Sequence, residues 1–442
     1  MTAPEELLGE TPFVSYAYSY PHKTSYRPLE PPRPLRDVWR DESRESLFLY
    51  LHVPFCEFRC GFCNLFTIAN PATDWTQRYV DQIRREAEQV RAALPDACVA
   101  RLAIGGGTPT FLGVDQLAAL LQVATGVMGA RPKQIPVSIE ASPATATDEK
   151  LALLREFGVD RLSLGVQTFD ERDSRSMGRP QKTCDVEHTI TAVRATGFPV
   201  LNLDLIYGGE GQTIEAWLDS VKVAIEYQPE ELYLYPLYVR ALTGLGSKPN
   251  SWPDQRPLMY RKARELLLSC GYEQVSLRMF RAPQSPSQAP HDEGPVYCCQ
   301  SDGMIGLGPG ARSYCSTLHY STEYAVGKSG VAAILSDYLT RQATEFSSAR
   351  HGFLLDDEER QRRYLILSLL QAAGLQRSDY VARFGRDVLD DFPRLRELIS
   401  SGLAEENDYL RLTTTGLEWS DAIGPWLYSS RVQRLMESYT WR

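Results

Sequence analysis

The sequence predicts an α/β fold: a partial (β/α)6 barrel, preceded by an extended N-terminal arm and followed by a small helical, winged-helix-like cap domain. Two observations predict the barrel. Short β-rich runs alternate with helix-length segments, and a polar residue or a glycine cluster lies at the end of every predicted strand. This alternation requires parallel strands with right-handed crossovers, whose carboxyl ends share one rim. We therefore expect the functional residues on that rim.

The barrel is expected over residues 47–320, between an arm at 1–46 and a helical domain at 340–442. The predicted strands are 47–53, 99–105, 136–141, 160–166, 200–207 and 231–238. The clearest helices between them are 75–94, 114–127, 147–157, 184–196 and 213–227. Prolines are dense in the arm, which predicts neither helix nor sheet there. An arm packed over the core and a lid that contacts substrate are the two alternatives.

The composition argues against a nucleic-acid or membrane partner. The 442-residue chain has a net charge of −9, whereas such partners favour a basic face. No apolar run is long enough to span a bilayer and the N-terminus is acidic, so we expect no transmembrane helix, no signal peptide and a cytoplasmic location. Nine cysteines are too few for a disulfide scaffold. We expect Cys98, Cys184 and Cys270 to be small buried side chains.

Three cysteines follow the first predicted strand at C-x3-C-x2-C spacing: Cys56, Cys60 and Cys63. Thiolates this close on one loop should converge on one centre, and soft sulfur ligands suit an iron-sulfur cluster or zinc. Such sites usually take four protein ligands. The missing ligand indicates an open coordination position, or alternatively a zinc site completed by Cys298 or Cys315.

The other predicted strands also end in residues that can bind a ligand. Gly105 to Pro109 follows the second strand, Glu140 ends the third and Gln167 follows the fourth. The remaining two strands carry Asp204, Tyr235 and Tyr238 near their ends. Each residue alone could be a cap or a turn former, but their shared position on one rim favours ligand contact.

The C-terminal region predicts three helices and a short hairpin, at residues 356–373, 377–384, 392–400 and 409–413. This pattern is similar to a winged helix-turn-helix. The third helix is only mildly basic, whereas a DNA-reading helix needs a basic face. We therefore favour an accessory or substrate-capping role over DNA binding.

The cysteine motif, the run Gly105-Gly106-Gly107-Thr108-Pro109 and the six-strand barrel together resemble the radical S-adenosylmethionine (SAM) superfamily. Within it, the chain resembles the branch of oxygen-independent coproporphyrinogen III dehydrogenase. The stretches that carry this resemblance are Tyr50-Leu51-His52-Val53-Pro54-Phe55-Cys56, Ser163-Leu164-Gly165-Val166-Gln167, Gly178-Arg179 and Asp204-Leu205-Ile206-Tyr207-Gly208.

The resemblance implies a 4Fe-4S cluster on Cys56, Cys60 and Cys63, with SAM on the fourth iron and a second SAM beside it. Two sets of positions match SAM contacts of the family. The first SAM would contact Tyr50, Gly106 and Glu140. The second would contact Phe62, Gly107, Thr108, Gln167, Arg179 and Asp204. Tyr238 and Arg312 complete the expected cofactor-binding set.

One segment departs from the parent enzymes. Haem chaperones of this branch carry His-Asn-x2-Tyr-Trp before a glycine run, whereas this chain has Tyr297-Cys298-Cys299-Gln300-Ser301-Asp302 before Gly303 to Arg312. This segment and the aromatic arm resemble class C radical SAM methyltransferases of natural-product pathways. That resemblance implies transfer of a one-carbon unit from the second SAM to an sp2 carbon, giving methylation or a cyclopropane.

The implied partners are an aromatic natural-product intermediate as substrate, an electron donor of the flavodoxin or ferredoxin type, and a second methyltransferase-like enzyme of the pathway. Tyr297, Cys299 and Asp302 are the expected catalytic residues by location. The alternatives are a coproporphyrinogen III dehydrogenase and a haem chaperone of the same branch.

Overall fold

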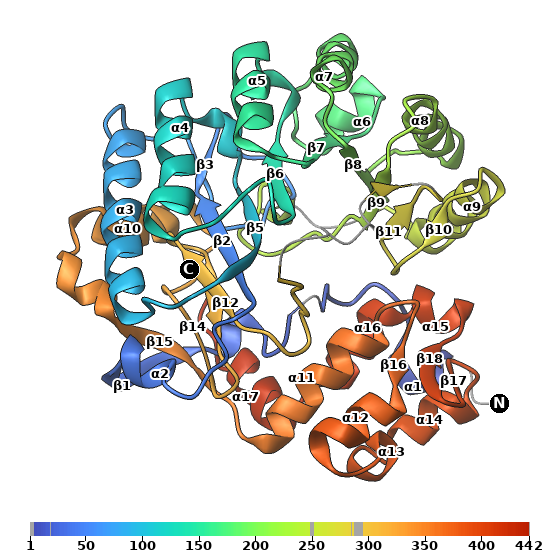
Figure 1. Cartoon of the computed structure of the whole chain (residues 1–442). Helices are drawn as coiled ribbons and strands as arrows, with labels where there is room; N and C mark the ends of the chain where they lie inside the picture. The colour runs from blue at the N-terminus through green and yellow to red at the C-terminus, as the bar shows by residue number, and fades with distance from the viewer. Residues whose placement is uncertain (1–3, 18, 248–251, 284, 287–294, 442) are drawn as a thin grey trace.

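The computed structural model describes residues 4–17, 19–247, 252–283, 285–286 and 295–441. A curved sheet forms one side of the molecule, and the C-terminal helices lie across its open side (Figure 1). Among the described residues, no helix is long and apolar enough to cross a membrane.

Six parallel strands form the predicted partial barrel, and the predicted fold class is confirmed. In sheet order they are β2 (Leu47–Val53), β5 (Val99–Gly106), β6 (Val137–Ala141), β7 (Arg161–Gln167), β8 (Val200–Tyr207) and β9 (Glu231–Pro236). The helices on the outer face are α3 (Trp75–Ala93), α4 (Val114–Gln122), α5 (Asp148–Phe157), α7 (Thr183–Thr196) and α8 (Ile214–Glu226) (Figure 1). Because both faces of these strands are covered, their residues are mostly buried and apolar.

Seven further strands extend the sheet beyond the six. At one edge β12 (Met304–Leu307) pairs parallel with β2 and continues the sheet away from the barrel. The antiparallel strands β13 (Arg312–Tyr314), β14 (Leu318–Ser321), β15 (Ser348–Leu354) and β1 (Arg27–Pro34) follow it. At the other edge are β11 (Met279–Arg281) and β10 (Glu273–Gln274). The glycine-rich segment from Gly303 to Arg312 therefore begins with strand β12, which lies beside β2, the first barrel strand.

The arm departs from the prediction that its prolines prevent sheet. Residues Arg27–Pro34 form β1 and pair antiparallel with β15. The register shifts between Pro28 and Arg33, and β1 is the outermost strand. An edge strand tolerates proline because one side of it needs no ladder hydrogen bond. The expectation of neither helix nor sheet in the arm is therefore wrong for these residues, and also for the short helices α1 (Pro4–Leu8) and α2 (Leu35–Val38).

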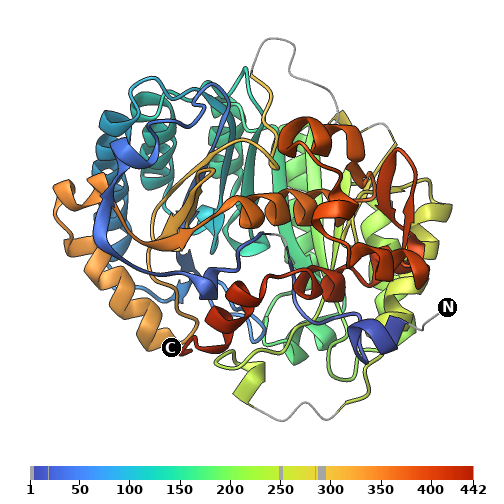
Figure 2. The same ribbon diagram turned by 90° about the horizontal axis from the view of Figure 1, so that it is seen from below.

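Among the described residues, two large hydrophobic cores and one small cluster are buried. The first lies between the barrel strands and their outer helices. The second lies in the C-terminal region and also takes in Ala17, Tyr20 and Tyr26 of the arm. The elements of this region are α11 (Asp357–Leu369), β16 (Leu375–Gln376), α12 (Arg377–Phe384), α13 (Val388–Asp391), α14 (Leu395–Ser400), β17 (Ala404–Glu406), β18 (Tyr409–Leu412), α15 (Thr414–Glu418), α16 (Ser420–Trp426) and α17 (Ser430–Glu437). Figure 2 shows these helices packed across the mouth of the barrel, with the arm between them and the strands.

The cysteines outside the motif are less buried than predicted. Cys98, Cys184 and Cys270 are exposed, so the expectation of small buried side chains is wrong for all three. Cys184 lies in the first turn of α7 and Cys270 caps α9 (Arg256–Ser269), positions where a side chain faces solvent. Cys315 is buried, as a free thiol without polar partners usually is.

Candidate active site

The barrel, the arm and the C-terminal helices enclose one cavity of about 1170 Å³. It begins at the cysteine motif and passes along the inner face of the sheet. Every expected cluster and cofactor residue lines it: Tyr50, Cys56, Cys60, Phe62, Cys63, Gly106, Gly107, Thr108, Glu140, Gln167, Arg179, Asp204, Tyr238 and Arg312. Of the expected catalytic residues, Tyr297 and Cys299 line it and Asp302 does not.

The three motif cysteines lie at one end of the cavity. Their loop is closed at its base by a short parallel pairing of β3 (Phe55–Cys56) with β4 (Ile68–Ala69). Thr108 Oγ1 lies 3.8 Å from the Cys56 sulfur, and Arg179 Nη1 donates to the Cys60 sulfur at 3.3 Å. Burial raises the pKa of the Cys56 thiol to about 12, and the nearby Cys63 adds to the shift. A positive iron centre reverses such a shift because it binds the thiolate form.

The glycine-rich turn after β5 brings the backbone against the cysteine loop. Gly107 N–H donates to Val53 O at 2.7 Å and Thr108 N–H donates to Phe55 O at 2.8 Å. A Cβ on Gly107 would lie 2.6 Å from Phe55 O and 3.0 Å from the Cys56 sulfur. This glycine is therefore required for the close approach of the two segments.

Glu140 and Asp204 place two carboxyl groups on the inner wall. Glu140 Oε2 accepts from Gly106 N–H at 2.9 Å. Burial raises the pKa of Glu140 to about 7, and the nearby Asp204 contributes to the rise. Asp204 accepts from Asn202 Nδ2 at 2.8 Å and from Ser163 Oγ at 3.2 Å, and burial raises its pKa as well. Both carboxyl groups can accept hydrogen bonds from hydroxyl groups of a bound ligand.

Gln167 and Arg179 lie together on the wall beside the cysteines. Gln167 has φ 68° at the end of β7, where the register with β8 shifts, and this backbone turns its side chain inward. Its Oε1 is buried and accepts no hydrogen bond from the described residues. Arg179 Nη2 donates to Gly165 O at 2.7 Å, and a Cβ on Gly165 would meet Gln167 Nε2 at 2.9 Å. Gly165 therefore leaves room for both side chains.

His52 was not among the expected site residues, although it lies within the Tyr50 to Cys56 stretch. Its Nε2 lies 2.9 Å from Phe66 O, which can only accept, so Nε2 carries the hydrogen. Its Nδ1 lies 3.2 Å from the Tyr50 hydroxyl. Burial lowers the pKa of His52 to about 4, which keeps the ring neutral. The tautomer therefore directs the Tyr50 hydrogen toward His52.

The sequence also did not reveal a cluster of buried side chains that connects the barrel region, the C-terminal region and the arm. Arg278 pairs with Asp421 of α16, and Tyr238 also donates to the Asp421 carboxylate. The Arg278 guanidinium lies 3.7 Å from the centre of the Tyr16 ring, which belongs to the arm. Arg278 and Asp421 are 5% and 3% exposed. No sequence signal pairs residues 143 positions apart.

The turn at 297–302 and Arg312 lie elsewhere on the cavity wall. The Tyr297 ring packs against Phe48 at the start of β2, with ring centres 5.3 Å apart. Asp302 accepts from Cys298 N–H at 2.7 Å, so its carboxylate closes a turn behind the cavity wall. Arg312 Nη1 donates to Ser19 Oγ of the arm at 2.7 Å. The prediction from sequence position placed Tyr297, Cys299 and Asp302 together in the site. Only Tyr297 and Cys299 line the cavity.

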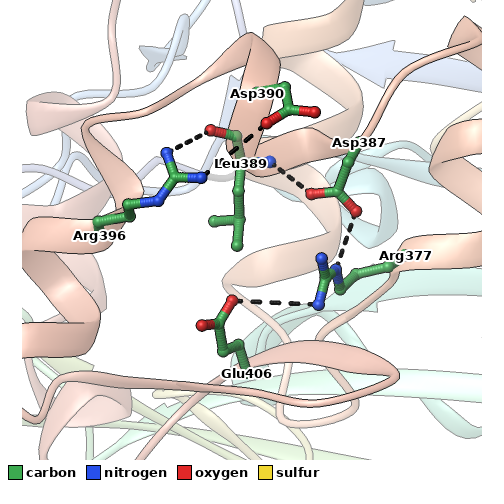
Figure 3. Close-up of a pocket in the computed structure, with 6 residues that line it drawn as sticks. All are labelled: Arg377, Asp387, Leu389, Asp390, Arg396 and Glu406. Atoms are coloured by element: carbon green, nitrogen blue, oxygen red, sulfur yellow. Dashed lines mark hydrogen bonds and ion pairs between the residues drawn. The ribbon is translucent and has the colours of Figure 1, made fainter.

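A second, more open pocket of about 500 Å³ lies on the C-terminal region (Figure 3). Arg377 contacts Asp387 at 2.9 Å and Glu406 at 4.0 Å. Arg396 contacts Asp390 at 3.9 Å and donates to Leu389 O at 2.9 Å. The charged groups of this pocket pair with one another, so a structural role explains them.

Comparisons with known proteins agree with this geometry. Residues 50–224 match the radical SAM superfamily, and residues 355–419 match the HemN C-terminal domain. A segment similar to the radical SAM superfamily is therefore followed by a segment similar to the HemN C-terminal domain. The chain is 29% identical to the oxygen-independent coproporphyrinogen III oxidase of Cereibacter sphaeroides, over 86% of this chain and 88% of that one. It is 27% identical to the heme chaperone HemW of Bacillus subtilis, over 81% and 93%.

The fold is also similar to the solved structure of coproporphyrinogen III oxidase (HemN) from Escherichia coli. The TM-score is 0.77 at 22% identity, and the match covers 96% of this chain and 98% of that one. The comparisons thus support a radical SAM protein of the HemN and HemW type. They overturn the prediction of a class C methyltransferase or cyclopropanating enzyme of natural-product biosynthesis, because the relatives carry the names of an oxidase and a chaperone. That prediction is wrong.

The predicted cofactors, a 4Fe-4S cluster and SAM, are confirmed at the level of the superfamily. The residues fit them: three partly buried thiols that line one end of the cavity are soft ligands suited to iron. Within the described part of the chain, no three His, Cys, Asp or Glu side chains are arranged to hold a single metal ion. Cys298 and Cys315, the fourth ligands of the zinc alternative, do not line the cavity with the motif cysteines.

Proposed function

We propose that this protein is an oxygen-independent coproporphyrinogen III oxidase, or a radical SAM enzyme acting on a similar carboxylate-bearing substrate. The observation that carries the proposal is the charge of the cavity wall. The cations on it are Lys23, Arg101, Arg179, Arg240, Arg278, Arg312 and Arg363. The acidic residues on it are Glu57, Glu140, Asp204 and Asp421.

This excess of cations is opposite in sign to the net charge of −9 for the whole chain. Burial also raises the pKa values of Glu140 and Asp204, which reduces the negative charge at the wall. Guanidinium groups in an enclosed site bind carboxylates through paired hydrogen bonds. A porphyrinogen with several propionate groups has the complementary charge.

Each part of the wall has a role in this proposal. Cys56, Cys60 and Cys63 hold the cluster, while Tyr50, Gly106 and Glu140 contact the SAM bound to it. When bound there, the cluster and SAM would supply the radical chemistry needed to remove a hydrogen atom from the substrate. The arm and the C-terminal helices exclude water from that end of the cavity.

Gln167, Arg179 and Asp204 support a second SAM next to the first, on a wall that also includes Phe62, Gly107 and Thr108. The buried Gln167 Oε1 accepts no hydrogen bond from the described residues, so a ligand donor can bind it without displacing a protein group. Equilibrium binding of SAM to the reconstituted protein should give a stoichiometry of two. A single site in wild type would contradict this part of the proposal.

The activity is tested by anaerobic incubation of the reconstituted protein with coproporphyrinogen III, SAM and a reductant. Chromatography after oxidation of the porphyrinogens should show products that have lost one and two carbon dioxide molecules, with 5'-deoxyadenosine formed in parallel. The Cys60→Ala variant is the matched control and should form neither. Cleavage of SAM without decarboxylated porphyrin would contradict the oxidase.

The same samples test the haem chaperone. The His-Asn-x2-Tyr-Trp segment of the chaperones is absent here, and Tyr297 to Asp302 stands in its place. We therefore expect no stoichiometric haem band after loading and gel filtration. Stable haem binding together with no decarboxylation would favour the chaperone over the oxidase.

A further inference from the structure

Two adjacent cysteines lie on the turn at 297–302, apart from the three cluster cysteines. Both Cys298 and Cys299 are free and exposed. Cys299 lines the cavity, whereas Cys298 does not. Cys299 is therefore the one of the two residues that borders the cavity.

Both thiols point at a single acceptor. Cys298 Sγ donates to Gln300 Oε1 at 3.3 Å, and Cys299 Sγ donates to the same oxygen at 3.1 Å. Two sulfur atoms that reach one oxygen lie on the same side of the turn. Adjacent cysteines usually place their side chains on opposite sides of an extended backbone, so this convergence is a property of the turn.

The backbone of the turn is held from both sides. Asp302 accepts from Cys298 N–H at 2.7 Å, and Asp302 N–H donates to Cys298 O at 2.8 Å. Arg363 of α11 donates to Cys299 O and to Gln300 O, each at 2.9 Å. The hydrogen bonds between Cys298 and Asp302 close the turn. Those from Arg363 hold the turn against α11 of the C-terminal region.

We propose that Cys298 and Cys299 form a reversible vicinal disulfide, a redox site separate from the iron-sulfur cluster. The oxidant is a small disulfide of the glutathione class. The Cys298 thiolate attacks it, forming a mixed disulfide and releasing one thiolate. The Cys299 thiolate then attacks the Cys298 sulfur, which closes the protein disulfide and releases the second thiolate. Two electrons pass from the protein to the oxidant, and two protons leave the cysteines.

The positions of the two thiols agree with this order. Cys298 meets the oxidant first because it lies outside the cavity, and Cys299 is the resolving thiol. Burial raises the pKa of the Cys299 thiol, which the nearby Arg363 only partly offsets, so Cys299 reacts second, after the mixed disulfide has formed at Cys298. Closing the bond removes both donors from Gln300 Oε1 and changes a part of the cavity wall that Arg363 ties to α11.

The reconstituted holoenzyme is treated anaerobically with glutathione disulfide, and tryptic peptides are weighed. Cleavage after Arg281 and Arg312 gives a peptide whose only cysteines are Cys298 and Cys299. This peptide should lose the mass of two hydrogen atoms, and dithiothreitol should restore it. Cys184, exposed and without a cysteine neighbour, is the internal control and should instead gain one glutathione. The visible absorbance of the cluster should not change.

The Cys298→Ser variant is the second arm of the test. It leaves Cys299 without a partner, so Cys299 should carry glutathione and no internal bond should form. A wild-type peptide that carries glutathione, or that stays unmodified while Cys184 is modified, would overturn the proposal.

Discussion

Gly106 lies against the ring of His52, and a Cβ on this glycine would be 2.5 Å from the ring carbon Cε1. Gly310 faces the same ring, where a Cβ would meet Nε2 at 2.6 Å. Two glycines from segments far apart in the sequence thus enclose the imidazole that orients the Tyr50 hydroxyl. The packing of His52 between these glycines therefore helps to shape this end of the cavity.

The Gly106→Ala substitution should destabilise the protein and weaken SAM binding. Gly106 has φ 109°, which an alanine adopts only with strain of roughly 1–3 kcal/mol, and the new Cβ clashes with His52. The matched control is Gly113→Ala in the next loop, where φ is −61° and the nearest atom to a Cβ is 3.8 Å away. Thermal denaturation and SAM titration compare the two. Equal behaviour of the variants would contradict the steric role of Gly106.

Replacing Cys56, Cys60 or Cys63 singly by alanine should abolish the cluster absorbance and SAM cleavage. All three cysteines line the end of the cavity where the cluster is expected. Among the other described cysteines, Cys299 alone lines the cavity. Cys184→Ala on the solvent face of α7 is the control and should reconstitute fully. Iron analysis and visible absorbance decide the result. A triple variant that still binds a full cluster would refute the assignment of the motif.

The sequence revealed the barrel because its signals are local. Each of the six strands is a short apolar run between helix-length segments, and β2 and β8 have the bounds that the pattern predicts. The rim residues also followed from topology, because parallel strands bring their carboxyl ends to one edge. Glu140, Gln167 and Asp204 accordingly line the same cavity.

The remaining features depend on contacts between distant segments. Arg278 and Asp421 form a buried pair across two cores, and neither lies in a recognisable pattern. The strand at Arg27–Pro34 exists because β15 offers it an edge, which overrides the low sheet propensity of its prolines. Asp302 was placed in the site by its neighbours, whereas its side chain closes a turn. The local pattern of apolar and polar residues does not show which distant residues will come into contact.

Asp421→Ala should destabilise the protein by about 3–5 kcal/mol, because it leaves the Arg278 charge buried without its partner. The control is Asp219→Ala, which removes an exposed ion pair with Lys222 and should cost less than about 1 kcal/mol. Chemical denaturation of the two variants measures the difference. A change for Asp421→Ala as small as for the control would show that the pair does not hold the C-terminal helices to the barrel.

Stability should fall as pH rises through the range in which Glu140 titrates. Its pKa is raised from 4.5 to about 7 in the folded protein, chiefly by burial, so the folded state retains a proton that the unfolded state has lost. The contribution of this proton is complete below pH 4.5 and is lost as the pH rises through about 7; because the Glu140 side chain is open to the cavity, water there screens the effect and keeps it small. Asp204, whose pKa is also raised by burial, has the same sign.

Glu140→Gln isolates the contribution of Glu140, because the amide keeps the shape and does not titrate. The free energy of unfolding, measured between pH 5 and about 8 for both proteins, should fall more steeply with pH for wild type than for the variant. The two curves should become parallel only above the folded pKa of about 7, at roughly pH 8, where Glu140 is ionised in both states. Parallel curves over the whole range would mean that the folded protein does not hold the Glu140 proton, and that water in the cavity solvates this carboxyl group as well as bulk water does.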